Sequence, residues 1–146
     1  MKLSLSIILG LILSFSSAQM RASDSIINAS HAWVQEGPPS AEVLAGYMDL
    51  QNQSSQAQTL LGARSTDFKS VMLHQTVNKG GMAHMNHTPR IEIKPGSTLQ
   101  LTSGGYHLML MSPKKALRQG DRVEVLLEFN GGLVMPVKLK VSKERP

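Results

Sequence analysis

Apolar and polar residues alternate in short runs along most of this chain, and glycine, proline and asparagine separate the runs. A period of two places every second side chain on one face, which is typical of a strand with one buried face. The pattern predicts strands at residues 26–34, 45–51, 59–63, 70–77, 90–93, 98–102, 106–111, 122–129 and 133–141. Without a convincing amphipathic helix, these strands predict a single all-β domain, an antiparallel β-sandwich or barrel.

The clearest connection is a hairpin at the end of the chain. Residues 122–129 and 133–141 alternate well and are joined by the turn sequence Asn130-Gly131-Gly132. Proline has no backbone N–H to donate, so Pro136 predicts an edge position or a bulge in the second arm.

Three other local expectations follow from the pattern. Residues 98–102 are expected to pair with residues 106–111 through a Ser-Gly-Gly turn, which would leave His107 beside open solvent. Residues 78–89 have two adjacent glycines and no clean period, and therefore predict a loop or an irregular hairpin. Trp33 is expected in the core of the domain.

The first residues have the composition of an export signal. Lys2 precedes a mostly apolar run, and small residues around Ala18 and Ala22 fit a cleavage site. We expect a signal peptide at residues 1–22, a mature domain at 23–146 and a periplasmic location. The apolar run is short for a membrane span, so no integral membrane protein is expected after cleavage.

The chain has no cysteine and a formal net charge of +5. The missing thiol excludes a disulfide framework, a thiolate nucleophile, a cysteine-rich zinc site and a blue-copper centre. Basic residues gather near the C-terminus, where they form either a solvated face or a docking surface for an acidic partner. Nucleic acid is not an expected partner of an exported protein.

Histidine and methionine are concentrated between residues 74 and 111. The set comprises His74, Met82, His84, Met85, His87, His107, Met109 and Met111. Imidazole nitrogen and thioether sulfur, without thiolate, suit copper and above all Cu(I) better than zinc or a hard cation. His31 lies outside this stretch and is expected to be structural.

Strand alternation predicts which of these side chains share a face. His107, Met109 and Met111 are two positions apart, so they point to one side while Leu108 and Leu110 face the core. In the earlier strand Met72 and His74 point outward. If the two strands are neighbours, two imidazoles and a thioether meet, and the segment around Met85 can supply a fourth ligand.

At these residues the sequence resembles the periplasmic copper chaperones of the PCuAC family, which are associated with the copper A centre of cytochrome c oxidase. The family signature is a histidine, a methionine eleven positions later, then a histidine twenty-two positions after that, followed by any residue and a methionine. His74, Met85, His107 and Met109 fit every interval. Flanking segments such as LHQT, IEIKPGSTLQL and GGYHLMLM also resemble the family.

The resemblance implies a cupredoxin-like domain with a Cu(I) site made by those four side chains. It also implies a partner that receives copper, such as cytochrome c oxidase or a thiol-bearing copper chaperone. His84 and His87 depart from the sequence that the family usually has around the second ligand. These two histidines, Met82 and Met111 are therefore possible additional ligands, and Cu(II) binding is a possible second mode.

Two other classes of function remain open at this stage. One is a periplasmic copper storage or resistance protein without an oxidase client. The other is an exported β-sandwich interaction module that binds no metal. An enzyme is not expected, because the chain has no nucleophile with an orienting base, no carboxylate pair and no phosphate-binding loop.

Overall fold

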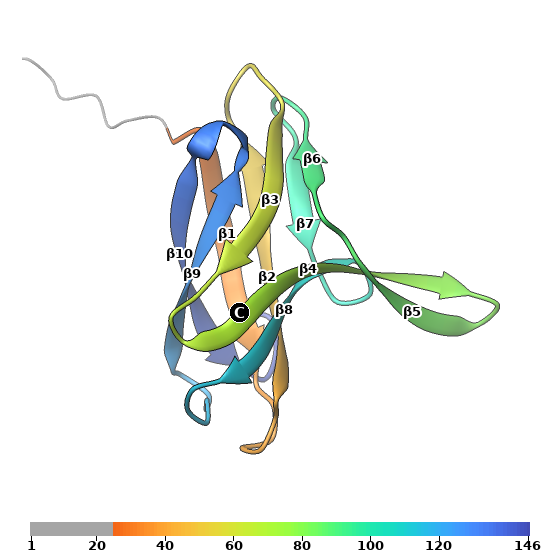
Figure 1. Ribbon diagram of the computed structural model, residues 1–146, viewed down its shortest axis with the longest axis vertical. Helices are drawn as coiled ribbons and strands as arrows, with labels where there is room; N and C mark the ends of the chain where they lie inside the picture. The colour runs from red at the N-terminus through yellow and green to blue at the C-terminus, as the bar shows by residue number, and fades with distance from the viewer. Residues whose placement is uncertain (1–24) are drawn as a thin grey trace, which may run out of the picture.

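The computed structural model describes residues 25–146, and these form an almost entirely β domain (Figure 1). The strands are β1 (Ile27–Gln35), β2 (Val43–Asn52), β3 (Gln58–Arg64), β4 (Phe68–Lys79), β5 (Met82–His87), β6 (Ile91–Ile93), β7 (Thr98–Leu101), β8 (Tyr106–Pro113), β9 (Arg122–Phe129) and β10 (Val134–Ser142). A short 3-10 turn, η1 (Asn130–Gly132), joins the last two. The predicted signal peptide lies outside the described residues and stays a prediction.

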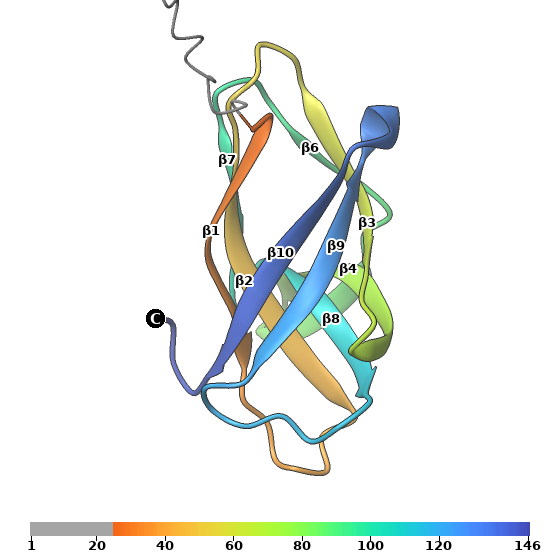
Figure 2. The same ribbon diagram turned by 90° about the vertical axis from the view of Figure 1, so that its left-hand side faces the viewer.

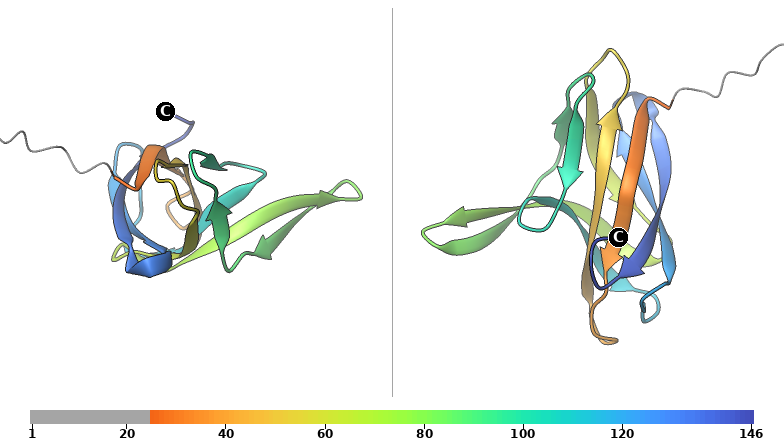
Figure 3. Two further views of the ribbon diagram at one scale, coloured as in Figure 1. Left: turned by 90° about the horizontal axis from the view of Figure 1, so that it is seen from above. Right: turned by 180° about the vertical axis from the view of Figure 1, so that it is seen from behind.

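Eight of the strands close into a barrel. Their order is β4-β8-β7-β2-β1-β10-β9-β3, and a pairing between β3 and β4 completes the ring. Seen from the side and from above, the strands surround one interior (Figures 2 and 3). β5 and β6 lie outside the ring, each added to one barrel strand. The predicted fold class, an all-β single domain of cupredoxin-like type, is confirmed. Two pairings, β1–β10 and β7–β8, are parallel rather than antiparallel.

The interior is filled by aliphatic side chains from alternate positions of the barrel strands. Leu108 and Leu110 of β8, Leu50 of β2 and Leu139 of β10 are fully buried in the core cluster. Each buried leucine contributes roughly 1.5–3 kcal/mol relative to an exposed one. With no cysteine in the chain, this packing rather than cross-linking stabilises the barrel.

The predicted C-terminal hairpin is confirmed, with β9 and β10 paired in register from Glu128↔Val134 to Arg122↔Lys140. Pro136 faces Leu126 on the β9 side. On the other side, β1 pairs with β10 only from Lys140 onward, so the proline lies at a locally open edge, as its missing N–H predicts.

The expectation that residues 98–102 and 106–111 form a hairpin is wrong. β7 and β8 run in the same direction and meet only at Leu101↔Tyr106. Both instead pair antiparallel with β2, β7 along its second half and β8 along its first half. The Ser-Gly-Gly segment is therefore a short interruption between two collinear strands.

Two further expectations, for residues 78–89 and for Trp33, are met in part. Of the two alternatives for residues 78–89, the hairpin is the one formed, and it is regular: β5 pairs with β4 from Lys79↔Met82 to His74↔His87 around Gly80 and Gly81, whose positive φ values suit a tight two-residue turn. This hairpin projects from the barrel (Figure 1). Trp33 is buried, as expected, although it packs outside the main core cluster, because its neighbour Val34 takes the inward position on β1.

Within residues 25–146, no helix is both long and apolar enough to span a bilayer.

Candidate metal centre

The centre of the candidate site is the pairing of β4 with β8. His74 lies directly opposite His107, and their ring centroids are 6.0 Å apart. Two pairs along, Met72 lies opposite Met109. Directly opposed residues share a face of the sheet, so two imidazoles and two thioethers stand together on the outer side of the barrel. The condition stated from the sequence, that these strands be neighbours, is met.

β5 adds a second row on the other side of His74. His87 lies directly opposite His74, with ring centroids 5.7 Å apart in an edge-to-face arrangement. Met85 lies opposite Thr76, which places it on the diagonal from His74, roughly 7–8 Å away between strand positions. Its side chain is 66% exposed. Methionine has three rotatable side-chain bonds, so its sulfur can swing toward His74.

The other candidate ligands divide between the two faces of the hairpin. His84 and Met82 alternate with Met85 and His87, so they point to the opposite side, where they face Val77 and Lys79 of β4. Met111 remains on the same face as Met109, opposite Ser70. The structure thus brings His87 and Met111 toward the cluster and sets His84 and Met82 apart from it.

His74 has an unusual environment for a histidine. Its Nδ1 atom is buried and has no hydrogen-bond partner. Burial lowers the pKa of His74 below its ordinary value of 6.5, and repulsion from His107 and His87 lowers it further. The imidazole is therefore held neutral near pH 7, the form that coordinates metals. A buried ring nitrogen without a partner is the kind of atom that a metal ion would satisfy.

His107 is oriented by the backbone. Its Nδ1 lies 3.1 Å from the carbonyl oxygen of Gly105, which also accepts a hydrogen bond from the Thr76 N–H at 3.0 Å. A ring with Nδ1–H donated to a carbonyl leaves Nε2 free as a ligand, the usual arrangement at histidine metal sites. His107 is only 7% exposed, so the expectation that it lies beside open solvent is wrong.

Sequence reasoning did not identify this role of Gly105. Its only signal was the Gly104-Gly105 pair, which indicated a turn but not a carbonyl aimed at a ring nitrogen. Met72 was recognised as outward-facing from alternation alone, and its position opposite Met109 required the register between β4 and β8.

The chemistry of the donor set favours a soft ion. Across residues 25–146, no three histidine or carboxylate side chains converge closely enough to hold a metal by themselves. Met72 and Met109 stand beside His74 and His107, so a site built here can recruit thioether sulfur from them or from Met85. Neutral nitrogen and thioether ligands fit Cu(I) and do not fit Mg²⁺ or Ca²⁺.

Comparisons with known proteins place the chain in a family. Residues 27–141 match the family described as LpqE-like. The protein Lxx21020 of Leifsonia xyli subsp. xyli is 35% identical over 117 residues, covering 80% of this chain and 69% of that protein. The protein RP573 of Rickettsia prowazekii is 26% identical over 111 residues, covering 70% of this chain and 57% of that protein.

Solved structures share the fold. Apo-DR1885 from Deinococcus radiodurans has a TM-score of 0.65 at 32% identity, covering 99% of this chain and 97% of that chain. Its Cu(I) form has a TM-score of 0.64 at 34% identity, covering 88% and 84%. The copper-bound PCuAC domain of PmoF2 has a TM-score of 0.68 at 23% identity, covering 82% and 94%, a likeness of fold alone.

The prediction that the protein is not an enzyme agrees with these comparisons, since the similar structures are named as PCuAC domains or as DR1885 in its apo and Cu(I) forms. The family match spans most of the chain, and the barrel superposes on PCuAC domains over four-fifths of its length. This chain belongs to the LpqE-like family and has a PCuAC-like fold.

Proposed function

We propose that this protein is a copper carrier that holds Cu(I) on the outer face of β4, β5 and β8. The observation that carries the proposal is the pairing of His74 with His107 beside the pairing of Met72 with Met109. The buried, unpartnered Nδ1 of His74 supports it, because that atom is otherwise left without a bond. The relationship to DR1885, a protein with a structure named as its Cu(I) form, supports the choice of metal.

The proposed ligands are His74, Met85, His107 and Met109. Two neutral imidazoles and two neutral thioethers leave the bound ion with a charge of +1, and thioethers resist the disulfide formation that disables thiols in an oxidising compartment. Met72 lies close enough to line the site. Met85 is the exposed member of the set and stands on the projecting hairpin, so it is the ligand that a partner would displace first.

The neighbouring imidazoles on β5, β4 and β8 support a second mode, in which His87 joins the site without the three rings holding copper by themselves. His87 lies opposite His74 on one side and His107 lies opposite it on the other. Cu(II) prefers imidazole to thioether, so oxidation would shift coordination from the methionines toward His87.

The proposed setting is the periplasm, reached by cleavage of the signal peptide, and the proposed client is the copper A centre of cytochrome c oxidase, directly or through a thiol-bearing chaperone. A storage or resistance role uses the same site without a client. Mixing the Cu(I)-loaded protein with the apo copper A domain separates the two: transfer of copper to that domain supports the chaperone, and retention by the carrier supports storage.

Competition with a chromophoric Cu(I) chelator tests the site. We expect one Cu(I) per chain, with affinity reduced roughly 100-fold or more in His107→Ala and Met109→Leu, because even outer partners of metal ligands are worth roughly 10- to 100-fold. Met135→Leu and His31→Ala, which alter residues away from the cluster, serve as matched controls. Unchanged affinity in both site variants would leave a β-barrel interaction module as the better account.

A further inference from the structure

A hollow lies on the outer face of β1 and β2, away from the candidate metal centre. It has a volume of about 270 Å³ and is lined by His31, Trp33, Tyr47, Met48, Asp49, Leu101, Thr102, Ser103 and Arg145. The rings of Trp33 and Tyr47 pack at a centroid distance of 5.0 Å and form an aromatic wall. Both are buried, yet neither belongs to the main core cluster. These two side chains therefore pack around an apolar space that borders the barrel core, since Met48 and Leu101 of the core cluster also line it.

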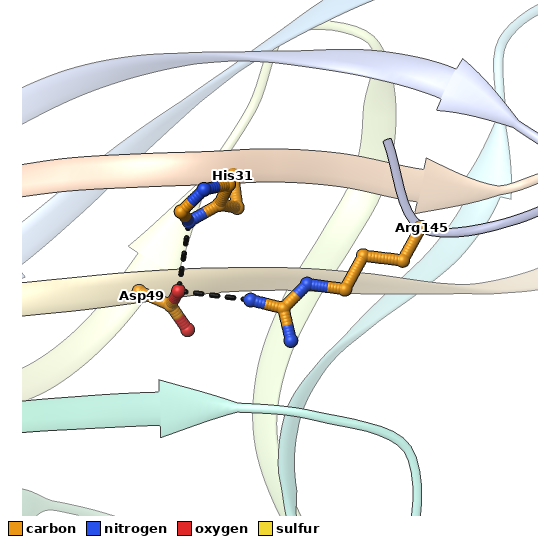
Figure 4. A network of polar contacts seen from close by, with 3 residues as sticks. All are labelled: His31, Asp49 and Arg145. Atoms are coloured by element: carbon orange, nitrogen blue, oxygen red, sulfur yellow. Dashed lines mark hydrogen bonds and ion pairs between the residues drawn. The ribbon is translucent and has the colours of Figure 1, made fainter.

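The mouth of this hollow carries an ordered polar network (Figure 4). The carboxylate oxygen Oδ2 of Asp49 accepts from His31 Nδ1 at 2.9 Å and from Arg145 Nη2 at 3.0 Å. The Asp49 side chain is only 14% exposed, so its negative charge is enclosed by these two basic groups. The Arg145 guanidinium has five N–H donors, and within residues 25–146 this is its one side-chain bond.

The backbone at His31 indicates that this arrangement is built rather than incidental. His31 has a φ of +50°, a conformation that costs a non-glycine residue free energy, and the pairing of β1 with β2 shifts register between Ser30 and Trp33. The bulge turns the imidazole toward Asp49 on β2. Strain of this kind persists where surrounding contacts over-determine it, and it is concentrated at binding sites.

We propose that this hollow binds a small aromatic carboxylate. An apolar cavity of roughly 150 Å³ holds one benzene molecule, so this volume accommodates one ring with an acidic side group or two fused rings. The ring would pack against Trp33 and Tyr47, and the carboxylate would take the free N–H groups of Arg145, which recognise carboxylates in bidentate fashion. A cation is disfavoured, because Asp49 already faces two basic partners.

The hollow is separate from the candidate metal centre. None of His74, Met85, His107 and Met109 lines it. The inference therefore does not rest on copper binding, and either can fail without the other.

Trp33 is the sole tryptophan of the chain, so its fluorescence and its indole N–H resonance report directly on this hollow. The mature, metal-free protein is titrated with phenylacetate, with the neutral phenylacetamide and with the cationic phenethylamine. We expect saturable changes with phenylacetate and a Kd at least about 10-fold higher for the amide, as loss of a charge-assisted hydrogen bond predicts.

Arg145→Gln should raise the Kd for phenylacetate to that of the amide. Arg122→Gln removes an exposed arginine on β9 that does not line the hollow, and it should leave the Kd unchanged. Equal affinity for acid and amide, tighter binding of the amine, or no saturable change with any of the three would each overturn the proposal.

Discussion

His74 is the residue on which the candidate site depends, because within residues 25–146 it is the only one opposed by an imidazole on both sides. His87 stands across from it on β5 and His107 on β8. Its Nδ1 is buried without a partner, and its pKa is lowered by burial and by both neighbours. A histidine in this state is costly to the apo protein and available to a metal ion.

The first prediction concerns the titration of His74 in the apo protein. Its NMR midpoint should fall below 6.5, and His87→Ala should move it back toward 6.5 by removing one repelling neighbour. His84→Ala, on the other face of the same strand, should not move it. A wild-type midpoint above 6.5 would contradict the environment described for this residue.

The same shift has a consequence for stability. Since the unfolded chain protonates His74 near 6.5 and the folded chain protonates it only at lower pH, the unfolded state binds more protons between the two values. The contribution of His74 to the free energy of unfolding is therefore undiminished above 6.5 and declines as pH falls through that window. Urea unfolding at a series of pH values should show a smaller decline in His74→Gln.

At the scale of elements, the β4–β5 hairpin presents different chemistry on its two faces. Met85 and His87 lie on the face of His74, whereas Met82 and His84 lie on the opposite face. Every residue of β5 is exposed, so substitutions there leave the core intact. The strand thus supplies its own matched controls.

The methionine pair gives the second prediction. Met85→Leu should weaken Cu(I) binding by roughly 10-fold or more, because a thioether ligand is replaced by an apolar group of similar volume. Met82→Leu should leave the affinity unchanged. Chelator competition measures both. An equal loss of Cu(I) affinity in the two variants would contradict the register of β5 with β4, which places only Met85 on the face of His74.

The histidine pair gives the third prediction. His87→Ala should lower the affinity for Cu(II) more than that for Cu(I), and His84→Ala should lower neither. Isothermal titration with Cu(II) at pH 7, alongside the Cu(I) competition, provides the comparison. If His84→Ala had the larger effect on Cu(II), a site on the opposite face would replace the one proposed.

The elements that could be predicted from sequence are those specified locally. β9 and β10 combine clear alternation with an Asn-Gly-Gly turn, and both arms and turn are where the pattern indicates. The pairing of β7 and β8 was predicted wrongly, because their common partner β2 lies about fifty to seventy residues earlier and no local signal indicates that pairing. β5 has no buried face and hence no apolar alternation, so its strand character comes only from pairing with β4.

The same division applies to the site. Alternation alone placed Met72 and His74 on one face and His107 and Met109 on another, and the register of β4 with β8 joined them. The separation of His87 from His84 could not be predicted, because it required the pairing of β5. The contact between the Gly105 carbonyl and His107 could not be predicted, because the residue type does not determine the direction in which a backbone carbonyl points.

At the scale of the molecule, a cysteine-free barrel supports the site by packing. The residues of β8 that alternate with His107 and Met109 are fully buried leucines, so core and site share one strand. The loop between β7 and β8 also touches both regions, since Thr102 and Ser103 line the aromatic hollow and Gly105 bonds His107.

The fourth prediction follows from that shared strand. Leu108→Ala should lower the free energy of unfolding by about 2–5 kcal/mol, the usual cost of truncating a fully buried leucine. Leu61→Ala, at a leucine 47% exposed, should change it by about 0.5 kcal/mol or less. Urea denaturation measures both, and similar losses would argue against the inward orientation of Leu108.

The central claim is that one copper ion binds between β4, β5 and β8. Anomalous diffraction at the copper edge from Cu(I)-loaded crystals tests it most directly. We expect a single strong peak within bonding distance of His74, Met85, His107 and Met109. A peak elsewhere, or copper bound only at the Met82 and His84 face of the hairpin, would contradict it.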